Sequence, residues 1–235
     1  MTVDLNCDMG EIEDAGHEAA LMEYITSANI ACGGHAGNET TMERTARLAM
    51  GRGVGIGAHP SYPDRDHFGR VELPMTAGEI ESTVLEQIDR LNAVVERLGG
   101  AIRHVKAHGA LYNVAAKNEP VARAIGMAVA RWNPRATLFG LAGSKSLEVW
   151  RGMGLPVAAE AFADRRYEPD GSLRPRRFAD ALITDPRQAA IQALRFAREG
   201  IAATICVHGD TPGAVEILKA CREALDGAHF SSKLS

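Results

Sequence analysis

The segment VDLNCD, residues 3–8, alternates apolar and polar side chains without interruption. Successive side chains of a β-strand point to opposite faces, so this strand has one apolar and one polar face. The same alternation recurs in GIGAH (55–59), HVKAH (104–108) and TICVH (204–208). Strands of a doubly wound sheet are covered on both faces and are apolar throughout. The pattern therefore favours a closed barrel, whose apolar faces pack against outer helices and whose polar faces line a lumen.

Seven strand-like runs of this kind alternate with longer segments of helical periodicity. The runs are Val3–Asp8, Ser27–Cys32, Val54–His59, Ile102–His108, Thr137–Leu141, Val157–Phe162 and Thr204–His208. Strand–helix alternation predicts a parallel sheet, either closed as a TIM-like barrel or open and doubly wound. An antiparallel sheet with one solvated face also alternates, but the long helical crossovers count against it. We expect an α/β fold with residues 1–235 in a single β/α barrel domain.

Helix starts are marked by capping residues at several places. Thr76 and Glu79 have the spacing of a capping box ahead of a regular apolar stripe. The pairs Asp185-Pro186 and Thr211-Pro212 each place a capping residue before a proline at the first helical position. Asn38 precedes another helical segment and is also expected to be an N-cap.

Composition excludes several classes of protein. The 235 residues are 46% hydrophobic and carry a formal net charge of −4, which argues against a disordered chain and against a general nucleic-acid binder. No run of about 20 apolar residues is present, so we expect no membrane span. The 4 cysteines are widely spaced and form no CxxC pair, which is typical of a reducing compartment and predicts a cytoplasmic protein.

Polar residues collect where the predicted strands end. Active sites of barrel enzymes lie at the C-terminal ends of the strands, so these residues are expected to share one cavity. They are Asp8, Glu11, Asn29, His35, His59, Asp64, Lys106, His108, Tyr112, Glu160, Asp164, Arg165, His208 and Asp210.

Each of these residues also has an ordinary structural interpretation. A single histidine at a strand end is more often a hydrogen-bonding residue than a catalyst, and Asp8 could cap the following helix. Glu160 and Asp164 could be solvated loop charges. The convergence of so many polar residues on one end of the fold favours a functional cavity over an independent structural role for each residue.

Two chemistries suit such a cavity. His35, His59 and Asp8 could hold Zn²⁺ or a similar ion that activates water for amide cleavage. Alternatively, Lys106, Arg165 and the histidines could hold an anionic substrate, with Asp8 or Asp210 as the base. No HExxH, GxxxxGK[ST] or GxSxG motif occurs, so the residues alone indicate a barrel hydrolase or lyase.

Six segments, taken together, resemble the signature segments of the LamB/YcsF family. They are VDLNCDMGE (3–11), SANIACGGHAGN (27–38), GAHPSYPDRDHFGR (57–70), HVKAHGALYN (104–113), EAFADRRYEPDGSLRPR (160–176) and CVHGDTPGAV (206–215). The resemblance covers nearly the whole chain in order. It departs from the usual pattern at Gly34, Asn38 and His67, where Phe, Asp and Gly are common.

This resemblance implies an irregular seven-stranded barrel of the glycoside hydrolase/deacetylase type. It also implies ATP-dependent opening of 5-oxo-L-proline to L-glutamate, together with partner subunits B and C. ATP is then a co-substrate. The resemblance leaves open whether Asp8, His35 and His59 hold a divalent metal. Two other functions remain as alternatives: a stand-alone metal-dependent amidohydrolase or deacetylase, and a non-catalytic carrier subunit.

Roles for the individual residues follow from this implied reaction. The expected catalytic residues are Asp8, His59, Lys106 and His208. The expected substrate-binding residues are Asn6, Asn29, His35, His108, Tyr112, Glu160, Asp164, Arg165 and Asp210.

Overall fold

The seven predicted strands close into one parallel barrel in the computed structural model, which describes residues 2–230. The strands are β1 (Asp4–Met9), β2 (Ser27–Ala31), β3 (Gly55–His59), β4 (Ile102–Lys106), β5 (Thr137–Leu141), β6 (Val157–Phe162) and β7 (Thr204–Cys206). Each strand pairs with its neighbours in chain order, and β7 closes the ring against β1, with Asp4 opposite Thr204 and Asn6 opposite Cys206. The predicted barrel is therefore confirmed, and the open doubly wound alternative is excluded.

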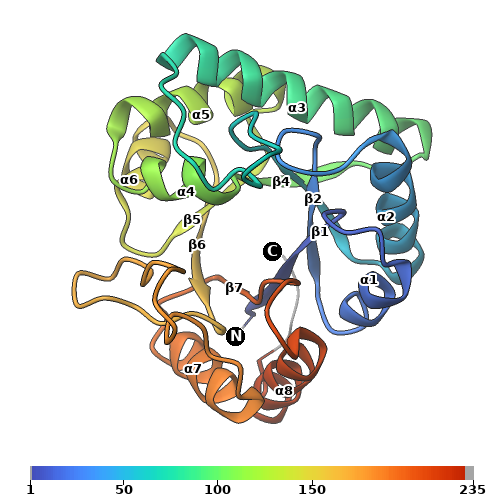
Figure 1. Cartoon of the computed structure of the whole chain (residues 1–235), viewed down its shortest axis with the longest axis vertical. Coiled ribbons are helices and arrows are strands. Elements are labelled where there is room, and N and C mark those ends of the chain that lie inside the picture. The colour runs from blue at the N-terminus through green and yellow to red at the C-terminus, as the bar shows by residue number, and fades with distance from the viewer. Residues whose placement is uncertain (1, 231–235) are drawn as a thin grey trace.

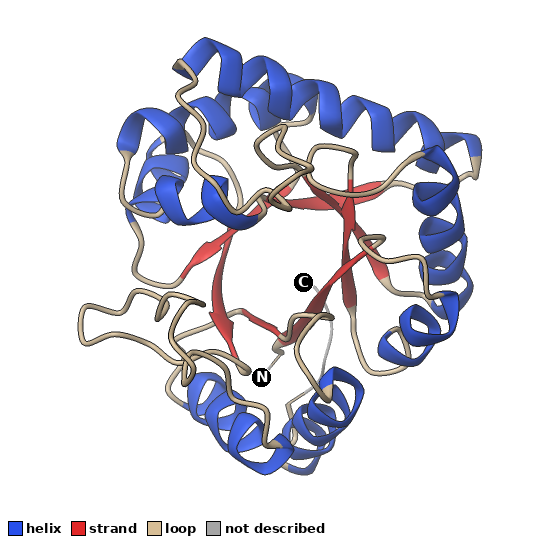
Figure 2. Cartoon of the chain, in the orientation of Figure 1, coloured by secondary structure: helices blue, strands red, loops and turns tan. Residues whose placement is uncertain are grey.

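Helices surround the ring of strands on its outer side (Figures 1 and 2). They are α1 (Ala15–Leu21), α2 (Glu39–Arg52), α3 (Ala77–Arg97), α4 (Gly109–Ala115), α5 (Glu119–Trp132), α6 (Lys145–Gly152), α7 (Pro186–Arg198) and α8 (Ala214–Gly227). The barrel is irregular, because β7 has only 3 residues and the register between β3 and β4 shifts at Ile56/Gly57. Within residues 2–230, no helix has both the length and the apolar character needed to cross a bilayer.

The polar faces of the strands point into the barrel, as the alternation predicts. Asp4 and Asn6 of β1 are buried, and the Asn6 amide donates to the Glu160 carboxylate of β6 (3.0 Å) and to the Thr204 hydroxyl of β7 (2.7 Å). Leu5 is equally buried but belongs to the apolar core. Because a buried polar group is costly without a partner, the lumen is stable only as a connected hydrogen-bond network.

Most predicted helix starts are confirmed. Thr76 and Glu79 form the expected capping box, Asn38 caps α2, and the Asp185 side chain accepts from the Gln188 backbone N–H.

The structure differs from the predicted elements in several details. Helix α8 begins at Ala214 behind Gly213, not at Pro212, because the Thr211 hydroxyl donates to the Asp164 carboxylate (2.5 Å) instead of capping a helix. β4 and β7 end two residues earlier than predicted, and the bounds of β1, β2 and β3 differ by one residue. The alternative role of Asp8 as a helix cap is excluded, since Asp14 is the N-cap of α1.

Gly57 of β3 is required by the width of the lumen. The His104 imidazole extends across from β4, and a Cβ built on Gly57 would overlap His104 Nε2. That nitrogen is 2.8 Å from Asn29 Oδ1, and the ring stacks on Phe139 with 4.2 Å between centroids. His104 has no room to withdraw, so any side chain at position 57 must displace the lumen network.

We predict that Gly57→Ala destabilises the protein by about 2 kcal/mol or more, because overpacking a filled interior typically costs about 1–3 kcal/mol. Chemical denaturation measures the effect. Gly51→Ala is the matched control: Gly51 lies in α2 with nothing within 4 Å of a built Cβ, so alanine there should be neutral or stabilising. Equal stability of the Gly57→Ala and wild-type proteins would show that the lumen is not packed as described.

Candidate active site

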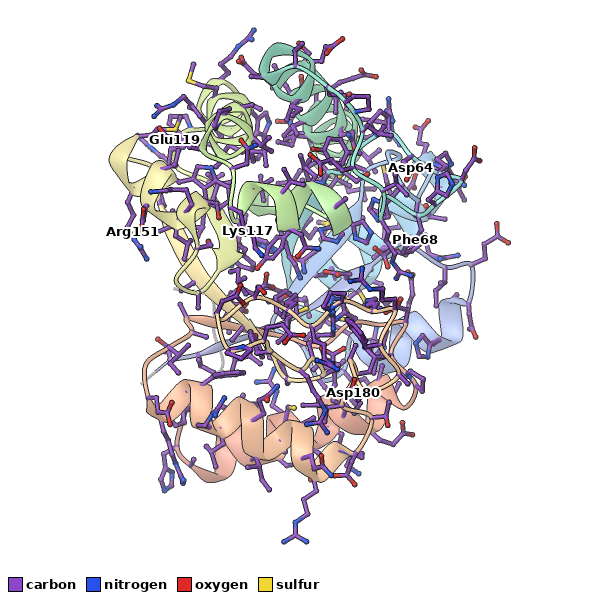
Figure 3. The ribbon with its side chains drawn as sticks, turned by 60° about the vertical axis from the view of Figure 1, so that its left-hand side comes forward. Asp64, Phe68, Lys117, Glu119, Arg151 and Asp180 are labelled. Atoms are coloured by element: carbon purple, nitrogen blue, oxygen red, sulfur yellow. The ribbon has the colours of Figure 1, made fainter. Side chains whose placement is uncertain are left out.

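A cavity of about 1020 Å³ opens at the C-terminal ends of the strands. Figure 3 shows side chains of the loops at this end, including Phe68 on the β3–α3 loop and Asp180 on the β6–α7 loop. Seven of the residues predicted from sequence line the cavity. They are Asp8, His59, Lys106, His108, Tyr112, Arg165 and His208.

The Lys106 ammonium is buried at the floor of this cavity. Its Nζ lies 3.0 Å from Asp8 Oδ1, 2.9 Å from Glu160 Oε1 and 3.1 Å from Cys206 Sγ. Burial alone lowers the pKa of Lys106, but the carboxylates of Asp8 and Glu160 outweigh it and raise that pKa well above its ordinary value. Burial likewise raises the pKa of Asp8, yet the charges of His59 and Lys106 hold it well below the usual range. Lys106 and Asp8 are therefore a charged pair at neutral pH.

Three histidines and a glutamate gather on one side of the cavity. His35 stacks on His108 with 3.7 Å between ring centroids, and His35 Nε2 lies 2.9 Å from Glu11 Oε1. His59 lies edge-on to both rings, and its Nε2 is 3.4 Å from Asp8 Oδ1. Burial lowers the pKa values of His35 and His108, and neighbouring imidazoles lower them further. These two rings are therefore neutral at pH 7.

The tautomers of His59 and His108 follow from their backbone contacts. His59 Nδ1 is 2.7 Å from the Lys106 carbonyl oxygen, and His108 Nε2 is 3.0 Å from the Phe68 carbonyl oxygen. A carbonyl only accepts, so both of these nitrogens carry hydrogen. In the neutral His108 ring the remaining nitrogen, Nδ1, is then a lone pair, and it faces His59 Nε2 at 2.9 Å. Two ring nitrogens this close need a proton or a metal ion between them.

The donor set of this cluster fits a divalent metal ion. Ligand atoms of Glu11, His35, His59 and His108 all lie within 4.8 Å of one another, and imidazole with carboxylate is a set that Zn²⁺ accepts. Backbone carbonyls orient the His59 and His108 rings, as outer hydrogen-bond partners commonly do for metal-binding histidines. Of the three ligands expected from sequence, His35 and His59 belong to this cluster. Asp8 groups with Cys206 and His208, although its Oδ1 is 3.4 Å from His59 Nε2.

A fourth imidazole, that of His208 just after the end of β7, lines the same cavity. His208 Nδ1 lies 3.0 Å from Asp164 Oδ2, and the same carboxylate accepts from the His208 backbone N–H and the Thr211 hydroxyl. Burial raises the pKa of Asp164, but the adjacent His208 imidazole and these hydrogen bonds lower it below its usual value overall. Asp164 is therefore an anion that accepts from Nδ1 of His208 and fixes the ring, and Nε2 is the nitrogen left to exchange a proton.

The remaining predicted residues lie behind or around the cavity wall. Asn6, Asn29 and Glu160 are in the lumen beneath it, and Asn29 donates to Asp8 Oδ1 at 2.9 Å. His35 and Asp164 do not line the cavity themselves: His35 contacts Glu11, and Asp164 contacts His208. Asp210 is at the rim, where it pairs with Arg70 and with Arg176 (2.9 Å).

Several residues of the site have no predicted role. Glu11 follows a predicted strand end but is given no role from sequence, and Cys206 is not among the predicted site residues. Lys117, Arg176 and Arg177 line the cavity from loops whose paths no local pattern predicts. The run of arginines at 174, 176 and 177 is the sequence signal that could have indicated two of these.

A comparison with known families decides the membership of the chain. The model of the LamB/YcsF family matches residues 3–233. The chain belongs to the LamB/YcsF family.

Relatives within the LamB/YcsF family cover almost the entire chain. It is 49% identical over 243 residues to the A subunit of 5-oxoprolinase from Chloroflexus aggregans, covering 97% of this chain and 96% of the relative. The crystal structure of the lactam utilization protein from Thermus thermophilus matches with a TM-score of 0.92 and 40% identity, over 99% of both chains. The name of the first relative identifies it as one subunit of a larger assembly.

The barrel type expected from the family resemblance is confirmed by more distant structures. The family 4 carbohydrate esterase from Streptomyces lividans has a TM-score of 0.55 at 11% identity and covers 99% of this chain and 92% of that one. This likeness establishes a shared deacetylase-type barrel and nothing about substrate.

Proposed function

We propose that this chain is the A subunit of an ATP-dependent 5-oxoprolinase, which opens 5-oxo-L-proline to L-glutamate together with subunits B and C. The observation that carries the proposal is the 49% identity, over nearly the full length of both chains, to a protein of that name. The whole chain acts as a single domain in this proposal. We place it in a reducing compartment such as the cytoplasm, because its 4 cysteines are buried and free.

The reaction sets three requirements for a site. Water must add to the lactam carbonyl carbon, the ring C–N bond must break, and the leaving nitrogen must gain a proton. ATP, the co-substrate, makes this feasible by phosphorylating the lactam oxygen, which makes the carbonyl carbon more electrophilic. After the C–N bond breaks, the product is an acyl phosphate, and a second water hydrolyses it to L-glutamate and phosphate. The site therefore needs a base for water, an acid for nitrogen and cations near the oxygen.

His208 is the group best placed to move a proton. Its Nε2 is the nitrogen left to exchange a proton, while Asp164 holds the ring through Nδ1 and stabilises the imidazolium that forms. The proton taken from water can pass to the ring nitrogen as the C–N bond breaks. Asp164 was expected to bind substrate, but it is fully buried, so we assign it the positioning role instead.

Lys106 supplies positive charge at the floor of the cavity. Its ammonium is fixed by Asp8 and Glu160, so it stabilises negative charge developing on the lactam oxygen without reorganising. Asp8 also lies 3.4 Å from His59 Nε2 and keeps the histidine cluster next to the reacting group.

A divalent ion, where bound, would be held by Glu11, His59 and His108, with His35 orienting the Glu11 carboxylate. It would polarise an oxygen or lower the pKa of a bound water. The same cluster supports the second candidate function, a stand-alone metal-dependent amidohydrolase or deacetylase, because its donor set needs no partner subunit.

An assay of glutamate release from 5-oxo-L-proline separates these functions. With subunits B and C we expect turnover that requires ATP, and we expect Asp8→Ala or His59→Ala in this chain to abolish it while the far-ultraviolet circular dichroism stays unchanged. ATP-independent hydrolysis by the purified chain, with stoichiometric metal that a chelator removes, would establish the amidohydrolase instead. Full turnover in both variants would indicate that the chain is a non-catalytic carrier subunit.

Asp164→Asn tests the positioning role. An amide in place of the carboxylate favours the wrong tautomer of His208, so we expect kcat to fall by about 10²–10⁴-fold, the usual contribution of general acid–base catalysis, with little change in KM. Asp170→Asn is the control, since Asp170 is an exposed aspartate on the same loop whose carboxylate accepts from Ser172. A rise in KM without a fall in kcat would assign Asp164 to substrate binding instead.

A further inference from the structure

Arg165 is a buried cation that has no counter-ion among residues 2–230. Only 6% of the residue is exposed, yet its guanidinium makes no salt bridge with any carboxylate in the described part of the chain. One nitrogen, Nη2, donates to the Arg174 carbonyl oxygen at 2.7 Å, and Nε is buried without a partner. Arginine does not escape this situation by losing its proton, because its pKa is far above neutrality.

The acidic groups around Arg165 are all engaged elsewhere. Asp164 holds His208, and Asp210 pairs with Arg70 and Arg176. Glu168 pairs with Arg174 at 3.0 Å. Lys106 differs in this respect, because it has two carboxylates within 3.0 Å.

Arg165 faces the same cavity as the proposed base. It directly follows Asp164 in the chain, so the residue that fixes His208 and the unpaired guanidinium are neighbours. Phe162 stacks on His208 with 5.1 Å between centroids and meets Tyr112 edge-on at 5.8 Å. These three rings form one wall of the cavity.

The Tyr112 hydroxyl lies beside the Glu160 carboxylate on the same wall. The residue is 6% exposed and its hydroxyl is buried. Burial, the nearby Glu160 charge and a hydrogen bond to the Glu160 side chain raise the pKa of Tyr112 well above its ordinary value, so the hydroxyl stays protonated. Tyr112 therefore already has an acceptor, and the Arg165 guanidinium is the group on this wall that lacks an anionic partner among residues 2–230.

We propose that Arg165 binds the carboxylate of a small cyclic amide acid, and that its guanidinium sets the specificity of the site for lactams bearing a carboxylate. The inference rests on the proposed function, from which it takes the lactam ring. The planar guanidinium fork matches a carboxylate, and the wall of Phe162 leads from there to His208. A phosphate group has the same attraction for Arg165, so the test must separate the two anions.

The test compares two ligands on the full-length chain by calorimetry: 5-oxo-L-proline and its uncharged carboxamide. Wild type should bind the carboxylate at least about tenfold more tightly than the amide, since a site built around a polar group rejects a ligand that leaves it unpaired. Arg165→Met should remove this preference by weakening binding of the carboxylate ligand alone. In the assembly, KM should rise with a smaller change in kcat.

Arg166→Met is the matched control, because Arg166 is the adjacent, exposed arginine and does not line the cavity. A stability measurement distinguishes a binding role from a structural one. Removing an uncompensated buried charge should leave the melting temperature of Arg165→Met unchanged or raise it, whereas a structural arginine would lower it.

Two outcomes overturn the carboxylate site. One is an unchanged preference for the carboxylate in Arg165→Met. The other is loss of inorganic phosphate binding in that variant while the preference between the two lactams persists, which would make Arg165 a phosphate-binding residue. Failure of the proposed function looks different: wild type would then bind neither lactam, and the reconstituted assembly would release no glutamate.

Discussion

The ion pairs of Lys106 are the interaction on which the rest of the structure depends. A lysine inside a barrel is tolerated only when its charge is matched, because desolvating an ammonium costs several kcal/mol. Asp8 of β1 and Glu160 of β6, the two strands that flank β7, supply that match to Lys106 of β4 across the lumen. The ammonium thereby connects three strands that are distant in sequence and fixes the floor of the cavity.

The polar lumen also explains why the two imidazole groups differ. On one side, backbone carbonyls orient the His59 and His108 rings so that two ring nitrogens converge. On the other, a buried carboxylate accepts from His208 Nδ1 and leaves Nε2 to exchange a proton. The first arrangement suits a bound cation and the second a moving proton, so one cavity contains both a receptor and a base.

The barrel could be predicted from sequence because strand alternation and helix caps are local signals. Alternation in residues 3–8 separated inward from outward side chains, and capping pairs such as Thr76 and Glu79 placed the helix starts. Thr211-Pro212 gave the same local signal and was wrong, because a tertiary contact with Asp164 took the hydroxyl.

The site was only partly predictable for a related reason. Strand ends identified which residues meet in the cavity, but their roles depend on contacts across the ring. Glu11 joins the histidines through a loop, and Asp164 turns away from the cavity to hold His208. Whether Arg165 has a counter-ion depends on how every nearby acid is paired, which no single segment records.

A double-mutant cycle on Lys106 and Glu160 tests the central claim most directly. Free energies of unfolding would be measured for Lys106→Met, Glu160→Gln and the double variant. Lys106→Met should cost about 3–5 kcal/mol, because it leaves the buried carboxylates without their cation. Glu160→Gln should cost less, because Asp8 still faces the ammonium. The double variant should be less destabilised than the sum by about 1–3 kcal/mol. Strict additivity of the two costs would contradict the account, since it would mean that the ammonium and the carboxylate do not stabilise each other.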